Sequence, residues 1–272
     1  MGYLSTDKKK ITTQTFAEMK KAGEKVTMLT AYDFTTAGII DAAGIDSILV
    51  GDSASNVMAG NADTLPITVD QMIYHARSVA RACNHAFVVC DMPFGSYQIG
   101  KEEALRNACR MMKETGVDAL KLEGGVEICD TVKALVAAGI PVHGHLGLTP
   151  QSVHKFGGYG IRAKEKAEAE KLISDAIALD EAGVFAIVLE KVPAKLAAEV
   201  SKRVKAVTIG IGAGNGCDGQ VLVYADAMGM TQGFKPKFLR HFAHVGEELT
   251  KGVQAYVEAV KTVGYPSVEE SY

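Results

Sequence analysis

The sequence lacks the features that mark several classes of protein. No apolar run approaches the roughly 20 residues that a membrane-spanning helix requires. The formal net charge is only -3, so the chain has no strongly basic field to attract nucleic acid or an anionic membrane. Residues 1–10 carry charge but no apolar stretch, and we therefore expect no secretory signal there. These absences predict a cytoplasmic protein that binds neither nucleic acid nor membrane.

Paired cysteines and linkers are also missing. The five cysteines form an odd set without a C-x-x-C pair, which favours reduced thiols among apolar neighbours over a zinc cluster. They are Cys83, Cys90, Cys109, Cys129 and Cys217. No stretch is low in complexity or resembles a linker between domains. We therefore predict one domain over residues 1–272.

What is present instead is a recurring unit: a short apolar strand, a polar residue at its end, and a stretch with helical spacing. Such alternation predicts parallel βαβ units, and eight of them favour closure into a barrel. The chain of 272 residues is long enough, since such a barrel needs roughly 250. The expected strands are residues 26–32, 47–53, 86–93, 119–125, 141–147, 186–192, 207–214 and, as the weakest, 225–230.

The segments between the strands carry helix signals. Thr68 and Gln71 have the spacing of a capping box and predict a helix that continues to Arg81. A further helix over 13–22 precedes the first strand, where it could cover the floor of a barrel. The predicted fold is thus a (β/α)8 TIM barrel with an extra N-terminal helix. An open doubly wound sheet is the alternative, because the eighth strand is weak.

Four carboxylates fall at the carboxyl ends of expected strands: Asp52, Asp91, Glu123 and Glu190. Reactive groups gather at that end of a barrel. Converging carboxylates repel one another unless a cation lies among them, and oxygen ligands without a thiolate favour magnesium over zinc. Two plainer interpretations stay open: a strand-end charge can cap or solubilise a loop, and the acids can form a salt-bridge network around Lys121.

Strand periodicity sharpens this interpretation. In the segment 119–123 the leucines share one face and Lys121 and Glu123 share the other. Leucines belong against the outer helices, so the two charged side chains should point into the barrel mouth. His143 and His145 share a face in the same way, and either could donate a hydrogen bond to a bound carboxylate or oxo group, or simply fill the interior.

Several strings together resemble one known family, from about residue 31 to residue 238. They are VGDS (50–53), DTLPIT (63–68), DMPF (91–94), KLEGG (121–125), GHLGLTPQ (144–151), FGGY (156–159), LE (189–190), GIGAG (210–214) and DGQ (218–220). GHLGLTPQ is highly specific, whereas GDS alone is weak. The chain resembles the ketopantoate hydroxymethyltransferases. The resemblance implies a barrel of the phosphoenolpyruvate/pyruvate type and a homodecamer of two stacked pentameric rings.

The resemblance also implies a reaction and its residues. A hydroxymethyl group passes from 5,10-methylenetetrahydrofolate to 3-methyl-2-oxobutanoate, forming 2-dehydropantoate (ketopantoate) in pantothenate and coenzyme A biosynthesis, through an enolate stabilised by Mg²⁺. The metal would lie on Asp52 and Asp91, with Glu123 in its surroundings. Substrate contacts would fall on Asp52, Ser53, Asp91 and Lys121, to which we add His145 from its position. The proton acceptor would be Glu190.

Two rival hypotheses remain at this point. One is a metal-dependent lyase or aldolase on the same barrel, which could use Lys121 as a Schiff-base nucleophile. The acidic neighbours of Lys121 oppose that variant because they keep the amine protonated. The other is a barrel without catalysis that serves as a ring-forming subunit.

Overall fold

The chain was analysed as a computed structural model that describes residues 9–231, 233 and 235–272. These form two compact units, 1–222 and 223–272, and each is considered by itself. Most of the segment for which no secretory signal is expected, residues 1–8, lies outside the described residues. The single domain over 1–272 stays a prediction.

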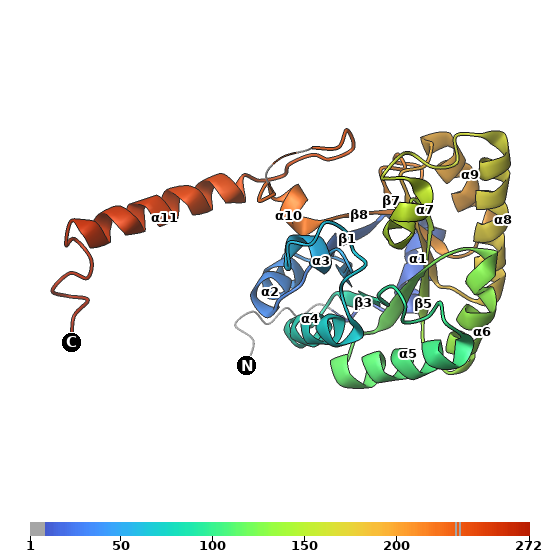
Figure 1. Ribbon diagram of the computed structural model, residues 1–272, viewed down its shortest axis with the longest axis horizontal. Coiled ribbons are helices and arrows are strands. Elements are labelled where there is room, and N and C mark those ends of the chain that lie inside the picture. Colours follow the sequence, from blue (N-terminus) through green and yellow to red (C-terminus); the bar gives the residue numbers. More distant parts are fainter. Residues whose placement is uncertain (1–8, 232, 234) are drawn as a thin grey trace. The chain divides into compact units, whose positions relative to one another are not determined.

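The first unit is a closed barrel of eight parallel strands in sequential order, with helices between the strands (Figure 1). This confirms the predicted fold and excludes the open sheet. The strands are β1 (Val26–Thr30), β2 (Ser47–Val50), β3 (Phe87–Asp91), β4 (Ala119–Glu123), β5 (Val142–Gly147), β6 (Ala186–Glu190), β7 (Val207–Ile211) and β8 (Gly219–Leu222).

The predicted eighth strand is wrong. Residues 225–230 contain most of a short helix, α10 (Tyr224–Ala227), while β8 lies earlier, at Gly219–Leu222. This strand is four residues long and begins with a glycine, so it lacks an apolar run. The glycine is required by packing, because a Cβ at Gly219 would collide with the carbonyl oxygen of Val26 on β1. β8 closes the barrel by pairing with β1 and β7.

Helices surround the strands. They are α1 (Thr13–Ala22), α2 (Phe34–Ala42), α3 (Ala54–Val57), α4 (Val69–Ala82), α5 (Lys101–Thr115), α6 (Cys129–Ala137), α7 (Val153–Phe156), α8 (Lys166–Ala182) and α9 (Ala194–Arg203), with single 3-10 turns η1 (Val126–Ile128) and η2 (Pro150–Ser152). The capping box before α4 is confirmed. The backbone N–H of Gln71 donates to Thr68 Oγ1 at 3.3 Å, and the side chain of Gln71 accepts from the backbone N–H of Thr68 at 2.8 Å.

The amino-terminal half of the barrel interior is apolar, and we call it the barrel floor. Its members are Phe16, Met19, Val26, Met28, Leu49, Phe87, Val89, Ala119, Ala186, Val188, Val207, Ile209 and Val221. Helix α1 closes the floor as predicted. The Phe16 ring is fully buried and meets the rings of Phe87 and Phe185 edge-on, each at 5.4 Å between centroids.

All five cysteines are free, in keeping with the prediction of reduced thiols. Cys90, Cys129 and Cys217 are buried, but Cys109 on α5 is exposed. Burial raises the pKa of the Cys90 thiol, and the neighbouring Asp91 raises it further. This thiol therefore stays protonated and belongs to the core.

The second unit contains α10 and one long helix, α11 (Val245–Lys261). No residue of α11 is buried, although Leu249, Val253, Val257 and Val260 recur along it at helical spacing. Neither this helix nor any other among the described residues is both long and apolar enough to cross a bilayer.

Candidate active site

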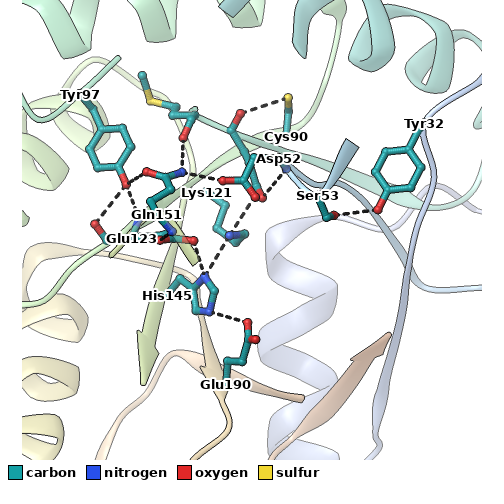
Figure 2. A network of polar contacts seen from close by, with 12 residues as sticks. Tyr32, Asp52, Ser53, Cys90, Tyr97, Lys121, Glu123, His145, Gln151 and Glu190 are labelled. Atoms are coloured by element: carbon teal, nitrogen blue, oxygen red, sulfur yellow. Dashed lines mark hydrogen bonds and ion pairs between the residues drawn. The ribbon is translucent and has the colours of Figure 1, made fainter. Parts of the chain in front are cut away.

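Six polar side chains that the sequence places at strand ends meet at the carboxyl end of the barrel, and Figure 2 labels all of them except Asp91. We call this group the barrel mouth. It comprises Asp52, Asp91, Lys121, Glu123, His145 and Glu190. All are buried except Glu190, which is half-buried. Strands β2 to β6 supply these residues in order, so five neighbouring strands form one continuous polar wall.

Lys121 lies at the centre of the mouth. Strand register sets it opposite Asp91, and its Nζ lies 3.1 Å from Asp91 Oδ1. The same nitrogen lies 3.1 Å from Nδ1 of His145. The flanking Leu120 and Leu122 are fully buried on the other face of β4. The predicted inward orientation of Lys121 and Glu123 is therefore confirmed.

His145 joins Lys121 to the half-buried Glu190. Its Nδ1 lies 3.3 Å from Glu123 Oε1, its partner across the strands, and its Nε2 lies 3.3 Å from Glu190 Oε2. A protonated lysine has no acceptor, so its contact with Nδ1 requires the lone pair there. The ring proton then resides on Nε2, which lies beside Glu190 Oε2 (Figure 2). Burial, followed by the charge of Lys121, lowers the pKa of His145, which keeps the ring neutral.

Asp52, Ser53 and Asp91 lie together at the ends of β2 and β3. The backbone N–H of Asp52 donates to Asp91 Oδ2 at 3.0 Å. A Cβ on Gly51 would lie 2.6 Å from Ser53 Oγ, so any larger residue there would displace the serine hydroxyl. The hydroxyl of Ser53 is 2.7 Å from that of Tyr32. Ser53 thus borders the mouth, as expected from the sequence.

Two residues without a sequence-assigned role complete the network. Gln151, in η2 after β5, donates through Nε2 to Asp52 Oδ2 at 2.8 Å and through its backbone N–H to Glu123 Oε2 at 2.9 Å. Tyr97 donates through its hydroxyl to Gln151 Oε1 at 2.7 Å. Gln151 ends the GHLGLTPQ string, which was a signal available in the sequence. Tyr97 lies in the loop after β3, where no pattern distinguishes it.

The electrostatics of the mouth show a shortage of positive charge. Burial raises the pKa of Asp52, and so do the charges of Asp91 and Glu123. Burial also raises the pKa of Glu123 to about 7. Burial lowers the pKa of Lys121, but the surrounding carboxylates outweigh it and hold that pKa above the ordinary value. Lys121 therefore stays an ammonium, which opposes a role as Schiff-base nucleophile.

A divalent cation fits this donor set. The alternative of a salt-bridge network around Lys121 is met in part, because Lys121 and Asp91 form an ion pair. One ammonium cannot neutralise three buried carboxylates, however. Apart from that ion pair, Asp91 Oδ1 accepts no hydrogen bond from a described residue. No group of three or more His, Cys, Asp or Glu side chains within the described ranges is spaced to hold a metal. Mg²⁺ commonly takes one or two carboxylates and keeps several waters.

A cavity of about 440 Å³ lies behind the strand ends rather than in the mouth. Its lining combines Leu146 of β5 with Phe156 of α7, Arg162 and the α8 residues Leu172 and Asp175. None of the six mouth residues contributes to this lining. The mouth, with its convergent charges, is the better candidate for chemistry.

Comparison with known proteins decides the family. The model of the ketopantoate hydroxymethyltransferase family matches residues 10–268. The chain belongs to this family. The resemblance drawn from the sequence motifs is thereby confirmed.

Curated members of the ketopantoate hydroxymethyltransferase family are similar along their whole length. The 3-methyl-2-oxobutanoate hydroxymethyltransferase of Parabacteroides distasonis is 59% identical over 98% of this chain and 97% of its own. The enzyme of that name from Christiangramia forsetii is 59% identical over 100% of both chains. That from Phocaeicola vulgatus is 58% identical over 100% of this chain and 99% of its own.

Solved structures support the barrel at low sequence identity. Phosphonopyruvate hydrolase, crystallised with oxalate and Mg²⁺, superposes with a TM-score of 0.61 at 12% identity, covering 96% of this chain and 93% of its own. Phosphoenolpyruvate phosphomutase from Streptomyces platensis subsp. rosaceus gives 0.58 at 15% identity, covering 93% and 87%. This chain therefore shares the barrel fold of these proteins.

Proposed function

We propose that the chain is a 3-methyl-2-oxobutanoate hydroxymethyltransferase that uses 5,10-methylenetetrahydrofolate as donor and Mg²⁺ as cofactor. The product is 2-dehydropantoate, the ketopantoate of pantothenate and coenzyme A biosynthesis. Family membership supports the reaction. The observation that carries it to particular residues is the convergence of three buried carboxylates, one ammonium and one half-buried glutamate at the end of a single barrel.

Asp52 and Asp91 are the residues that would hold the metal, with Glu123 beside it. When bound, Mg²⁺ supplies Lewis-acid polarisation of the 2-oxo group and so acidifies the C3–H bond. Ser53 and Lys121 border the same space and offer a hydroxyl and an ammonium to the substrate carboxylate and oxo oxygen. His145 offers the proton of its Nε2 to the same oxygens, because that nitrogen makes no hydrogen bond with a described residue and only lies 3.3 Å from Glu190 Oε2.

Glu190 takes the C3 proton. It is the most exposed acid of the mouth, so its carboxylate is accessible enough to reach substrate. Nε2 of His145 lies 3.3 Å from Glu190 Oε2 and borders that carboxylate. Lys121, kept charged by its neighbours, stabilises the negative charge that builds on the oxo oxygen as C3 is deprotonated.

Carbon–carbon bond formation follows at C3. The electron pair released from C3–H attacks the methylene carbon of the folate, and one of the two C–N bonds of that carbon breaks, its nitrogen taking up the proton removed from C3. Water then supplies the hydroxyl oxygen as the second C–N bond breaks, and the remaining proton of the water goes to the second nitrogen. Tetrahydrofolate leaves with the nitrogen electron pair. The residues of the mouth act on the oxo acid throughout, and the buried position of Lys121 and His145 keeps bulk water from the developing charge.

The decisive experiment is an assay of purified protein for 2-dehydropantoate, with each component omitted in turn. Product should form only when the oxo acid, the folate and Mg²⁺ are all present, and chelation should abolish it reversibly. Turnover of an oxo or hydroxy acid without folate would instead support a lyase.

We also propose a cytoplasmic homodecamer of two pentameric rings. The exposed apolar positions of α11 support assembly, because Leu249, Val253, Val257 and Val260 are left in solvent by the chain's own second unit. Native mass spectrometry should find ten copies. A monomer at micromolar concentration would contradict the proposed assembly but would leave the proposed reaction untested.

A further inference from the structure

Gln151 uses every hydrogen-bonding position of its side chain. Its Nε2 donates to Asp52 Oδ2 at 2.8 Å and to the carbonyl of Met92 at 3.0 Å. Its Oε1 accepts from the hydroxyl of Tyr97 at 2.7 Å and from Nε2 of Gln98 at 3.0 Å. A glutamine amide has two donor hydrogens and an acceptor oxygen with two lone pairs, so this set is complete. If the amide were flipped, its oxygen would face two acceptors, Asp52 Oδ2 and the carbonyl of Met92. The amide nitrogen must therefore point toward them, as drawn in Figure 2.

The backbone of the same residue reaches a second carboxylate. The N–H of Gln151 donates to Glu123 Oε2 at 2.9 Å. Asp52 follows β2 and Glu123 ends β4, so Gln151 connects acids on either side of β3. Gln151 is itself 7% exposed, and solvent competes little for these bonds.

One oxygen of Asp52 is left over by this arrangement. Oδ2 accepts from Gln151, whereas no hydrogen bond to Oδ1 is found in the described part of the chain. Asp91 is held in a similar way, with Oδ2 accepting the backbone N–H of Asp52. In each aspartate, Oδ2 therefore accepts a hydrogen bond from an amide of the protein, while Oδ1 accepts none from an amide.

We propose that Gln151 is a positioning residue for the metal site: it fixes the Asp52 carboxylate through Oδ2 and leaves Oδ1 to the cation, while its backbone holds Glu123 alongside. The inference rests on the proposed Mg²⁺-dependent function. Partners that orient metal ligands typically contribute about 10- to 100-fold to metal affinity. Gln151 should contribute on that scale although it touches no metal itself.

The test is a Mn²⁺ titration of metal-free protein, followed by electron paramagnetic resonance of the free ion. Gln151→Met keeps the length of the side chain and removes both donors, and it should weaken Mn²⁺ binding about 10- to 100-fold. Gln151→Asn keeps an amide but shortens the side chain by one methylene, so it should also weaken Mn²⁺ binding. This second variant serves as the test if Gln151→Met does not fold. Gln14→Met, on the exposed face of α1 at the opposite end of the barrel, is the matched control and should bind as the wild type does.

Kinetics separate positioning from general structural damage. In the Gln151 variants kcat should recover at saturating Mg²⁺, whereas the Mg²⁺ concentration for half-maximal rate should rise with the Mn²⁺ dissociation constant. Variants that fold and bind Mn²⁺ within threefold of the wild type would overturn the inference. So would a kcat loss that Mg²⁺ does not restore. A wild type that binds Mn²⁺ but forms no product would overturn the proposed function alone, because the affinity comparison stands without turnover.

Discussion

The barrel floor and the barrel mouth are built on the same strands, two residues apart. On β3 the inward side chains are Phe87 and Val89 in the floor and then Asp91 in the mouth. On β6 the apolar Val188 is followed by Glu190 in the same way. The floor buries apolar surface and makes no ion pair, while the mouth buries charges that Lys121 and hydrogen bonds from neighbouring amides compensate. One end of each strand thus provides stability and the other provides chemistry.

The comparison of floor and mouth shows how the regular register of parallel strands brings charged side chains together at one end of the barrel. Parallel register sets Asp91 beside Lys121, which form an ion pair, and Glu123 beside the neutral His145, so polar neighbours meet in the sheet without any loop being involved. Burying these groups opposes folding, and the apolar floor beneath them offsets the cost. Substitutions in the two regions should therefore separate cleanly into effects on activity and effects on stability.

The largest expected effect is that of Asp91→Asn. The variant loses one proposed metal carboxylate and the ion pair with Lys121, and several kcal/mol of Lewis-acid stabilisation correspond to a loss of roughly a thousandfold in kcat/KM. Mn²⁺ binding should fail in parallel. Asp46→Asn is the matched change at the amino end of β2, where Asp46 accepts from the Thr27 N–H at 2.8 Å. It should lower stability slightly and leave kcat unchanged. An Asp91→Asn protein that is active without metal would contradict the assignment of the metal site to the barrel mouth.

Glu190→Gln should rank next. Loss of a general base reduces kcat by about 10²- to 10⁴-fold, and exchange of the substrate C3 hydrogen with deuterated solvent should stop. The amide oxygen can still accept from His145, so Mn²⁺ affinity and melting temperature should be retained. Glu170→Gln on the exposed face of α8 controls for the loss of one charge. Undiminished C3 exchange in Glu190→Gln would assign the base elsewhere.

Phe16→Ala tests the floor. Removing a fully buried aromatic ring that meets Phe87 and Phe185 should cost about 3–5 kcal/mol in the free energy of unfolding. The midpoint of urea unfolding should fall accordingly, while kcat per folded molecule stays near that of the wild type. A large fall in kcat at unchanged stability would break the division between the two ends.

His143→Leu sharpens the boundary between them. His143 lies below the mouth on β5, fully buried, and neither ring nitrogen has a hydrogen-bond partner among the described residues. Burial and the charge of Lys121 lower its pKa well below the ordinary value. Leucine should stabilise the protein by about 1 kcal/mol near neutral pH, since it removes an unpaired polar group.

The pH dependence of that gain has a definite sign. A histidine whose pKa is depressed in the folded state stays neutral in both states above its unfolded pKa of about 6.5. As the pH falls below that value, the unfolded state binds a proton that the folded state does not, and stability is lost. The advantage of His143→Leu in thermal melts should therefore grow below about pH 6.5. His154→Leu, at an exposed position on α7, should show no such growth. A constant difference would contradict the lowered pKa of His143 in the folded protein.

Much of this division could be predicted from the sequence because strands have a period of two. The alternation of Leu120, Lys121, Leu122 and Glu123 fixes which side chains point inward, and parallel topology fixes which end they share. Six residues were brought together on that argument alone. Ser53 required the family resemblance, since a serine after a strand has no distinctive pattern.

The features that escaped prediction depend on contacts rather than periodicity. β8 begins with Gly219, which is selected by close approach to β1 and gives no hydrophobic signal. Tyr97 comes from a loop, and its position depends on where the loop after β3 folds back onto Glu123. Gln151 stands in a specific string, but its role follows from four side-chain hydrogen bonds that only coordinates reveal.

The closure of the floor by α1 has a kinetic consequence. Phe16 fills the amino end of the barrel, so the barrel is closed at that end. Substrates and products must therefore enter and leave through the mouth. Under the proposed function, the small oxo acid and the much larger folate would share that opening. Product-inhibition kinetics should therefore reveal a fixed order of binding and release.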